Sequence, residues 1–235
     1  MRPIFHSVAN FTASTLTKVL FAPIAPIRVW QARNMDRAGA FLLAANHISH
    51  FDPPIISSVA RRKIDWMAMA EFFSVPLLGS FLRAVDAFPA DRDRAERATI
   101  RTALERLKAG RIVGIFPEGG IRDGARSVLE GAPLRSGAVA LAHMAEVPIV
   151  PCVILGTDRL YAKRSWLPLR RTPIWIAFGD PIPHGAGLEK TAARARTEAQ
   201  LAMAFQNLYA ALREEFELTA DDLPQPPRER MRKAN

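Results

Sequence analysis

The chain has 235 residues, of which 49% are hydrophobic and 23% charged. This length and balance suit one domain with a substantial core, and they exclude the disordered and fibrous classes. The net charge of +9 favours an anionic partner: nucleic acid, a phosphorylated substrate or an anionic membrane surface. Because the basic residues are scattered and no zinc-finger or RNA-binding signature is present, we expect no nucleic-acid partner.

The first predicted element is an amphipathic helix within the N-terminal segment, residues 1–26. Ile4, Val8, Phe11 and Val19 fall near one face of this helix, and hydroxyl side chains fall on the other. Its polar residues and two late prolines argue against a membrane span. The apolar face either lies on a membrane or packs on the protein's own core, and the sequence favours neither alternative.

From residue 27 to residue 217, short apolar runs alternate with segments of helical period, which indicates an α/β domain. We expect a mixed, mostly parallel sheet flanked by helices. The predicted strands are Ile27–Gln31, Phe41–Ala45, Ile64–Ala68, Arg111–Phe116, Ile149–Leu155 and Ile174–Phe178.

Two long helices are predicted from apolar residues spaced three and four positions apart. The first covers about residues 94–109, and the second about residues 188–215. The second helix carries its apolar stripe at Leu201, Phe205, Leu208 and Leu212. Residues 218–235 are rich in proline and arginine and lack apolar periodicity, so they are predicted to form a mobile C-terminal tail.

Polar residues follow the predicted strand Phe41–Ala45 directly, among them His47 and Asp52. Open α/β sheets bind ligands at the carboxyl ends of their strands, and Asp52 before Pro53 is typical of a helix N-cap. A loop could fold the Asp52 carboxylate back onto the imidazole, which would fix its tautomer for general-base catalysis on a hydroxyl. The alternative is a polar histidine beside an aspartate that only caps the helix.

A second buried-strand pattern, residues 112–116, runs into a turn rich in proline and glycine. Glycine allows the backbone to approach a ligand closely, and Arg122 at the end of this turn could clamp a phosphate or carboxylate. The alternative is an ordinary turn with solvated charges. His6, His143 and His184 lack the spacing of metal ligands, and the sequence contains no serine-hydrolase elbow, P-loop or dinucleotide fingerprint. We therefore expect no metal and no cofactor.

Four segments, taken together, resemble the lysophosphatidate acyltransferase family of glycerolipid acyltransferases. Asn46, His47 and Asp52 match the family's NHxxxxD motif, and the other three blocks follow in the family's order and spacing. The other three are Ala87–Arg92, Phe116–Arg122, which is similar to FPEGTR, and Val147–Pro151. The third block departs from the family at Gly120 and Ile121, because the family has threonine and arginine there.

This resemblance implies that His47 removes the proton of an acceptor hydroxyl and that Asp52 orients His47. The acyl donor would be acyl-CoA or acyl-carrier protein, and no covalent acyl-enzyme would form. The resemblance also implies two sets of binding residues. Those for the acceptor are Asn46, Arg92, Phe116, Glu118, Gly119 and Arg122. Those on the acyl-donor side are Val147, Pro148, Ile149, Val150 and Pro151.

The implied reaction acylates the sn-2 hydroxyl of lysophosphatidate and gives phosphatidate for phospholipid biosynthesis. The altered Gly120 and Ile121 leave another lysolipid or hydroxylated lipid open as the acceptor. A non-catalytic module that binds anionic membranes is a second alternative, which the intact His47 and Asp52 disfavour. We expect peripheral attachment to the cytoplasmic face of a membrane.

Overall fold

The strands form one mixed, mostly parallel sheet in the order β1-β7-β6-β2-β5-β3-β4. The computed structural model describes residues 2–90, 97–167, 171–185 and 189–225. Every neighbouring pair of strands is parallel except β6 and β7. The strands are β1 (Ile27–Trp30), β2 (Phe41–Ala45), β3 (Ile64–Met69), β4 (Phe88–Ala90), β5 (Ile112–Ile115), β6 (Ile149–Leu155) and β7 (Ile174–Phe178). The predicted fold class is confirmed, and each predicted strand is found within one residue at either end.

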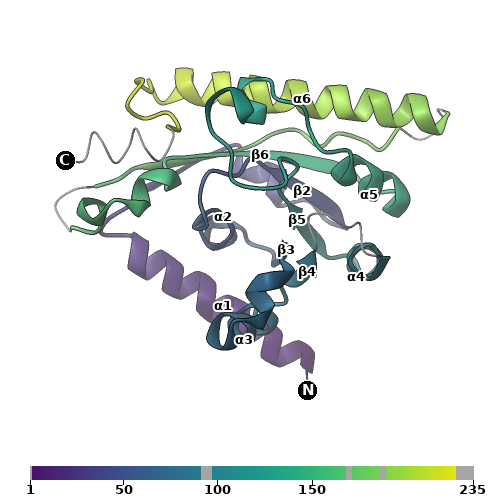
Figure 1. Cartoon of the computed structure of the whole chain (residues 1–235), viewed down its shortest axis with the longest axis horizontal. Coiled ribbons are helices and arrows are strands. Elements are labelled where there is room, and N and C mark those ends of the chain that lie inside the picture. The colour runs from purple at the N-terminus through teal and green to yellow at the C-terminus, as the bar shows by residue number, and fades with distance from the viewer. Residues whose placement is uncertain (1, 91–96, 168–170, 186–188, 226–235) are drawn as a thin grey trace.

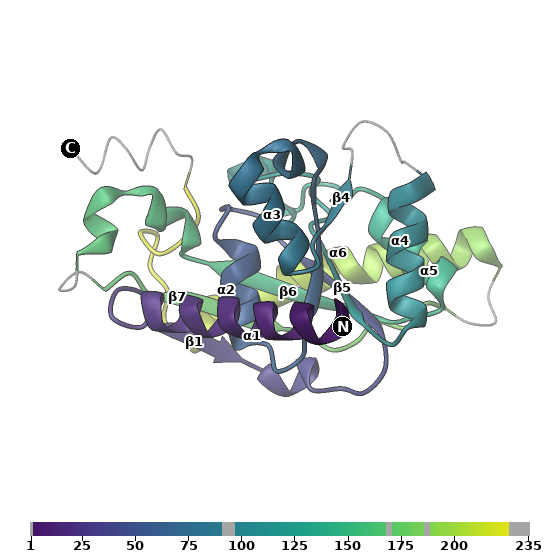
Figure 2. The ribbon, with the colours of Figure 1, turned by 90° about the horizontal axis from the view of Figure 1, so that it is seen from below.

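Helices cover both faces of this sheet (Figure 1). On one face lie α4 (Arg97–Lys108), α5 (Gly137–Ala145) and α6 (Lys190–Glu215); on the other lie α1 (Arg2–Phe21) and α2 (Asp52–Val59). The remaining helix, α3 (Pro76–Ala84), packs beside α1, as Figure 2 shows. Short 3-10 helices fill the connections: η1 (Ala32–Met35), η2 (Ala70–Ser74), η3 (Gly124–Arg126), η4 (Val128–Glu130), η5 (Thr157–Tyr161) and η6 (Lys163–Trp166).

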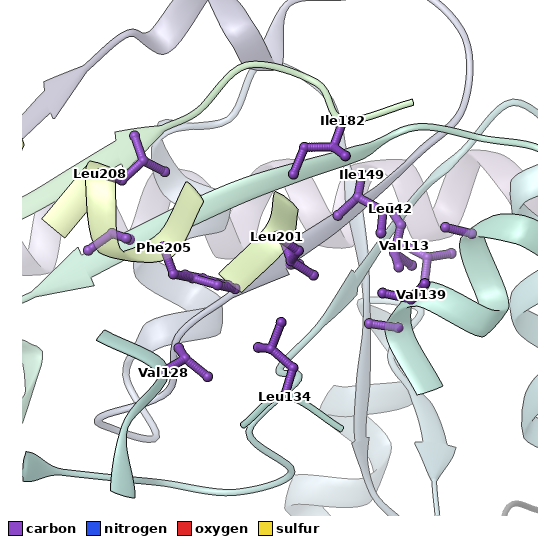
Figure 3. Close-up of a cluster of buried hydrophobic side chains, with 14 of the residues drawn as sticks. Leu42, Val113, Val128, Leu134, Val139, Ile149, Ile182, Leu201, Phe205 and Leu208 are labelled. Carbon is purple, nitrogen blue, oxygen red and sulfur yellow. The ribbon is translucent and has the colours of Figure 1, made fainter. Parts of the chain in front are cut away.

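The core consists of two apolar layers, one on each face of the sheet. Strand β2 contributes to both, because successive side chains of a strand point to opposite faces: Leu42 joins one layer and Leu43 the other. The predicted stripe of α6 packs on the first layer, where Leu201 and Phe205 lie against the strands (Figure 3). Full burial of such side chains stabilises the fold by ~1.5–3 kcal/mol each.

Helix α1 turns its apolar face outward. Val8, Phe11 and Val19 are 57%, 73% and 66% exposed, so the predicted apolar face does not pack on the protein's own core. Among the described side chains of α1, from Val8 on, only Phe21 enters the core, and the side chain of Ile4 lies outside the described part. None of the described helices is long and apolar enough to cross a membrane.

The predicted C-terminal tail is packed in its first part. Leu218 and Leu223 lie against the core, and Asp222 pairs with Arg159 at 3.2 Å. The packed body therefore extends past the predicted boundary at residue 217 to Gln225. Residues 226–235 of the predicted tail lie outside the described residues.

Candidate active site

The two polar segments predicted from the sequence leave the sheet side by side. Strands β2 and β5 are parallel neighbours, with Ala44 opposite Ile115, so the loops that follow them start at the same edge. The N–H of Arg122 donates to the carbonyl of His47 at 2.8 Å and ties the two loops together. The site is thus built at the carboxyl ends of adjacent strands, as expected for an open α/β sheet.

His47 and Asp52 form a hydrogen-bonded pair. The Nδ1 atom of His47 lies 2.8 Å from Oδ2 of Asp52, and the two side chains are 12% and 0% exposed. The same carboxylate accepts hydrogen bonds from the N–H groups of Ile48 (2.8 Å) and Ser49 (2.9 Å), and from the hydroxyl of Thr157. With Nδ1 occupied by Asp52, the other ring nitrogen of His47 remains for a substrate.

The prediction that Asp52 caps a helix is wrong. Helix α2 begins at Asp52, with Phe51 in the cap position, and no side chain caps its first N–H groups. Pro53 stands at the start of the helix as predicted, but the Asp52 carboxylate turns back into the preceding loop. The carboxylate therefore forms its hydrogen bonds with the loop and with His47, and none with the N–H groups of the helix.

A stack of aromatic rings supports the imidazole from behind. The ring of Phe116 lies on His47 with centroids 3.9 Å apart and an interplanar angle of 17°, and Trp66 lies on Phe116 at 4.9 Å and 11°. Gly114 makes room for this stack, because a Cβ at that position would lie 2.5 Å from the Trp66 ring. The stack restricts the plane of the imidazole. Phe116 was predicted as a site residue, whereas Trp66 was not.

Glu118 holds the backbone of His47 in place. One of its oxygens accepts from the His47 N–H at 2.5 Å, and the other accepts from the Ser127 hydroxyl at 2.8 Å and the Val128 N–H at 2.9 Å. The side chain is only 5% exposed. Burial raises the pKa of Glu118, and these three hydrogen bonds oppose that rise. Glu118 therefore acts on the position of His47, and Ser127, its partner, was not foreseen.

Asn46 faces the interior of the sheet rather than the site. Its side chain is 0% exposed, its amide donates to the carbonyl of Ile154 at 3.1 Å, and its oxygen accepts from the N–H of Ile154 at 2.7 Å. This placement contradicts the predicted contact with substrate. Asn46 instead fixes the start of the loop to β6.

The predicted acceptor residues after Glu118 lie in the loop that faces His47. Gly119 has φ +68°, a conformation that side chains rarely adopt. The Nη1 atom of Arg122 donates to the carbonyl of Ile121 at 3.2 Å. Arg92 falls within residues 91–96, outside the described residues.

Residues 147–151, predicted on the acyl-donor side, run alongside β2 toward the loop that carries His47. Strand β6 is parallel to β2, with Ile149 opposite Leu42 near the start of β2 and Pro151 opposite Ala44 near its end. Ile149 and Val150 are fully buried, and Pro148 accepts a backbone hydrogen bond from Leu42. None of Val147, Pro148, Ile149, Val150 and Pro151 lines the cavity at His47, and their role on the acyl-donor side stays a prediction.

A cavity of about 550 Å³ extends from His47 between β3, α1, α2 and α3. Its apolar lining includes Met67, Met69, Phe72, Leu78, Phe81, Leu82 and Val85. Its polar lining comes mainly from α1, which presents Asn10, Ser14 and Thr17 inward. No Lys, Arg, Asp or Glu occurs among the described lining residues. The cavity suits a long aliphatic group whose reactive end lies at His47.

The chain is similar to known proteins over much of its length. Residues 26–155 match the family model described as Acyltransferase. The chain is 33% identical over 148 residues to the 1-acyl-sn-glycerol-3-phosphate acyltransferase of Bacillus subtilis (strain 168), covering 63% of this chain and 71% of that one. It is 34% identical over 172 residues to the lyso-ornithine lipid O-acyltransferase of Rhizobium meliloti (strain 1021), covering 69% and 56%.

The fold is also found in a solved structure. The crystal structure of the 1-acyl-sn-glycerophosphate acyltransferase from Thermotoga maritima superposes with a TM-score of 0.63. The match covers 89% of this chain and 81% of that one, at 22% sequence identity.

Proposed function

The chain belongs to the acyltransferase family, and from that premise we propose that it transfers a fatty acyl group from a thioester to the hydroxyl of a lysolipid. The observation that carries the proposal is the His47–Asp52 pair, 2.8 Å apart, at the end of an apolar cavity. The preferred acceptor is the sn-2 hydroxyl of lysophosphatidate. The donor is acyl-CoA or acyl-carrier protein.

In the proposed mechanism, His47 acts as a general base. Its unoccupied ring nitrogen takes the proton of the acceptor hydroxyl, and the oxygen attacks the thioester carbonyl. The new O–acyl bond forms as the S–acyl bond breaks, and the imidazolium returns its proton to the leaving thiolate. Asp52 stabilises the imidazolium formed midway, since its carboxylate is held by Thr157 and two backbone N–H groups.

The apolar cavity provides the binding energy for the fatty chain. Burial of aliphatic groups against Met67, Met69 and Phe81 is worth ~0.8 kcal/mol per methylene. Methionine is unbranched and adapts to chains of different shape. The cavity ends at the imidazole, so a chain bound there carries its reactive end to the base.

A membrane surface is the proposed working location, on the cytoplasmic face and peripheral. Helix α1 has its polar residues toward the cavity and its apolar residues outward, which is the reverse of a helix on a water-facing surface. The neighbouring α3 adds Leu77, 88% exposed, and Phe81, 50% exposed. Acyl chains of a bilayer would cover both helices, and the net charge of +9 favours anionic lipid.

The acceptor has two candidates supported by different observations. The Bacillus relative acts on 1-acyl-sn-glycerol-3-phosphate by its name, which supports lysophosphatidate. The Rhizobium relative is a lyso-ornithine lipid acyltransferase, and Gly120 and Ile121 replace the family's threonine and arginine, which supports an acceptor without a phosphate monoester.

The test supplies labelled acyl-CoA and acyl-carrier protein with a panel of lysolipids and identifies products by mass spectrometry. We expect acylation of lysophosphatidate by the wild type and none by His47→Ala. A folded wild-type protein that acylates no lysolipid contradicts the proposal. Preference for lyso-ornithine lipid would retain acyl transfer and change the acceptor.

A further inference from the structure

An ionised head group meets no counter-charge among the described residues that line the cavity, since none of them is Lys, Arg, Asp or Glu. Transfer of an unpaired ion into such surroundings is costly. If the acceptor proposed above carries a phosphate or carboxylate, this group needs a counter-charge close to the reacting hydroxyl. Gly119 and Gly120 line the cavity together with His47.

Arg135 is positioned over this glycine segment. Its N–H donates to the carbonyl of Pro117 at 2.9 Å, and its side chain crosses the face of Gly119. A Cβ at Gly119 would lie 2.3 Å from Nε and 2.5 Å from Cζ of Arg135. Leu134, the preceding residue, is buried in the core and anchors this part of the chain (Figure 3).

The segment that Arg135 contacts is itself fixed to the catalytic pair. Glu118 lies between Pro117 and Gly119, and its carboxylate accepts the N–H of His47 at 2.5 Å. Arg135 is exposed, so an anion in solvent can reach it. A Cβ at position 119 would meet the Arg135 side chain, and the φ of +68° also favours glycine there.

We infer that Arg135 binds the oxyanion of the acceptor head group, a phosphate monoester or a carboxylate. A guanidinium presents a planar pair of donors that matches either group. Arg122, the residue that the sequence favoured, donates its N–H to the carbonyl of His47 and its Nη1 to the carbonyl of Ile121. The inference rests on the proposed acyl transfer and assigns its acceptor subsite.

The test compares Arg135→Gln with Arg126→Gln as a matched control. Arg126 lies in the same connection, is exposed and pairs with Asp123, so its loss removes one positive charge without touching the cavity. Initial rates are measured with three acceptors: lysophosphatidate, which carries a phosphate; lyso-ornithine lipid, which carries a carboxylate; and monoacylglycerol, which carries no anionic group. Arg135→Lys and Arg122→Gln complete the set, and thermal denaturation confirms that each variant is folded.

We expect Arg135→Gln to raise the KM for the preferred anionic acceptor by about 10- to 100-fold, as for loss of a charged hydrogen bond. The KM for the thioester and the rates with monoacylglycerol should stay at the level of Arg126→Gln, and Arg135→Lys should recover part of the loss. Inorganic phosphate should compete with lysophosphatidate in the wild type, and this competition should weaken in Arg135→Gln.

Four outcomes overturn the inference. If the wild type acylates an anionic acceptor but Arg135→Gln behaves like Arg126→Gln, or loses activity equally with monoacylglycerol, Arg135 does not bind the head group. A larger acceptor effect in Arg122→Gln assigns the subsite to Arg122 instead. If the wild type acylates monoacylglycerol but neither anionic acceptor, acyl transfer stands and the inference alone fails. If the wild type acylates none of the three lipids, the proposed function fails and the inference fails with it.

Discussion

Replacement of Asp52 by asparagine separates the charge of this residue from its hydrogen bonds. In the wild type, Oδ2 accepts from the His47 ring and from the N–H groups of Ile48 and Ser49, while Oδ1 accepts from the Thr157 hydroxyl. An asparagine oxygen can replace Oδ2, and its NH₂ group can then donate to Thr157, because a hydroxyl also accepts. The reverse orientation would place NH₂ against three donors, so the first orientation should hold.

The size of the effect follows from the charge alone. A unit-charge pair about 4 Å apart interacts with about 4 kcal/mol at an effective dielectric constant of about 20. The asparagine variant loses this stabilisation when the imidazolium forms. Because about 1.4 kcal/mol corresponds to tenfold in rate, we expect kcat to fall about 10³-fold. This value lies within the range of about 10² to 10⁴ that general-base catalysis contributes.

The assay measures kcat at saturating acyl-CoA and lysophosphatidate, with thermal denaturation of the same preparations. Asp52→Asn should keep a melting temperature near that of the wild type, since every hydrogen bond retains a partner. A kcat within tenfold of the wild type would refute the role assigned to the charge. A large fall in melting temperature would refute the hydrogen-bond assignment.

Four further variants probe other parts of the structure. Thr157→Val leaves one buried Asp52 oxygen without a donor, so it should destabilise the protein by about 1–3 kcal/mol in urea unfolding; unchanged stability would contradict that contact. In Glu118→Gln, the new NH₂ group must face the backbone N–H of either His47 or Val128, so two donors oppose each other. We expect a similar loss of stability together with a lower kcat. Full activity would show that His47 does not need the Glu118 carboxylate as an acceptor for its N–H. Burial lowers the pKa of Lys63 to about 8, so the folded state binds fewer protons than the unfolded chain at higher pH. Stability should therefore rise from about pH 8 to 10.5 in the wild type and less so in Lys63→Met, as read from melting temperatures; parallel curves would exclude this effect. Leu77→Asp should reduce sedimentation with anionic vesicles while the rate on detergent-dispersed substrate is kept, and equal sedimentation would place the membrane contact elsewhere.

Six of the seven strands could be predicted because each is a short apolar run between turn signals, whereas the three-residue β4, with Pro89 at its centre, was missed. Phe41–Ala45 is buried on both faces, and its unbroken hydrophobic pattern shows this directly. The His47–Asp52 pair could also be predicted, since both residues belong to one loop. The burial of residues 147–151 could not be related to the site from their composition. They were assigned to the acyl-donor side by resemblance, and in the structure Ile149 and Val150 are fully buried in β6, outside the lining of the cavity.

The supporting contacts of the site were missed because the residues that make them are distant in sequence, although Glu118 itself was predicted as an acceptor residue. Thr157 reaches Asp52 across 105 residues, and Glu118 reaches His47 across 71. Hydrophobic periodicity reports which face of an element is buried and carries no information on such contacts. The sequence does indicate that Trp66 is buried, because Trp66 shares a face of its strand with Ile64. Nothing in the pattern relates Trp66 to His47.

The amide of Asn46 gives the loop that carries His47 an unusual dynamic property. Loops normally open locally, with little cost in free energy. Asn46 directly follows β2, and its side chain makes two hydrogen bonds to the backbone of Ile154, in the middle of the sheet. The start of the loop thus belongs to the same cooperative unit as β2 and β6, and the amide hydrogen of Ile154 should exchange with solvent only when the whole sheet unfolds.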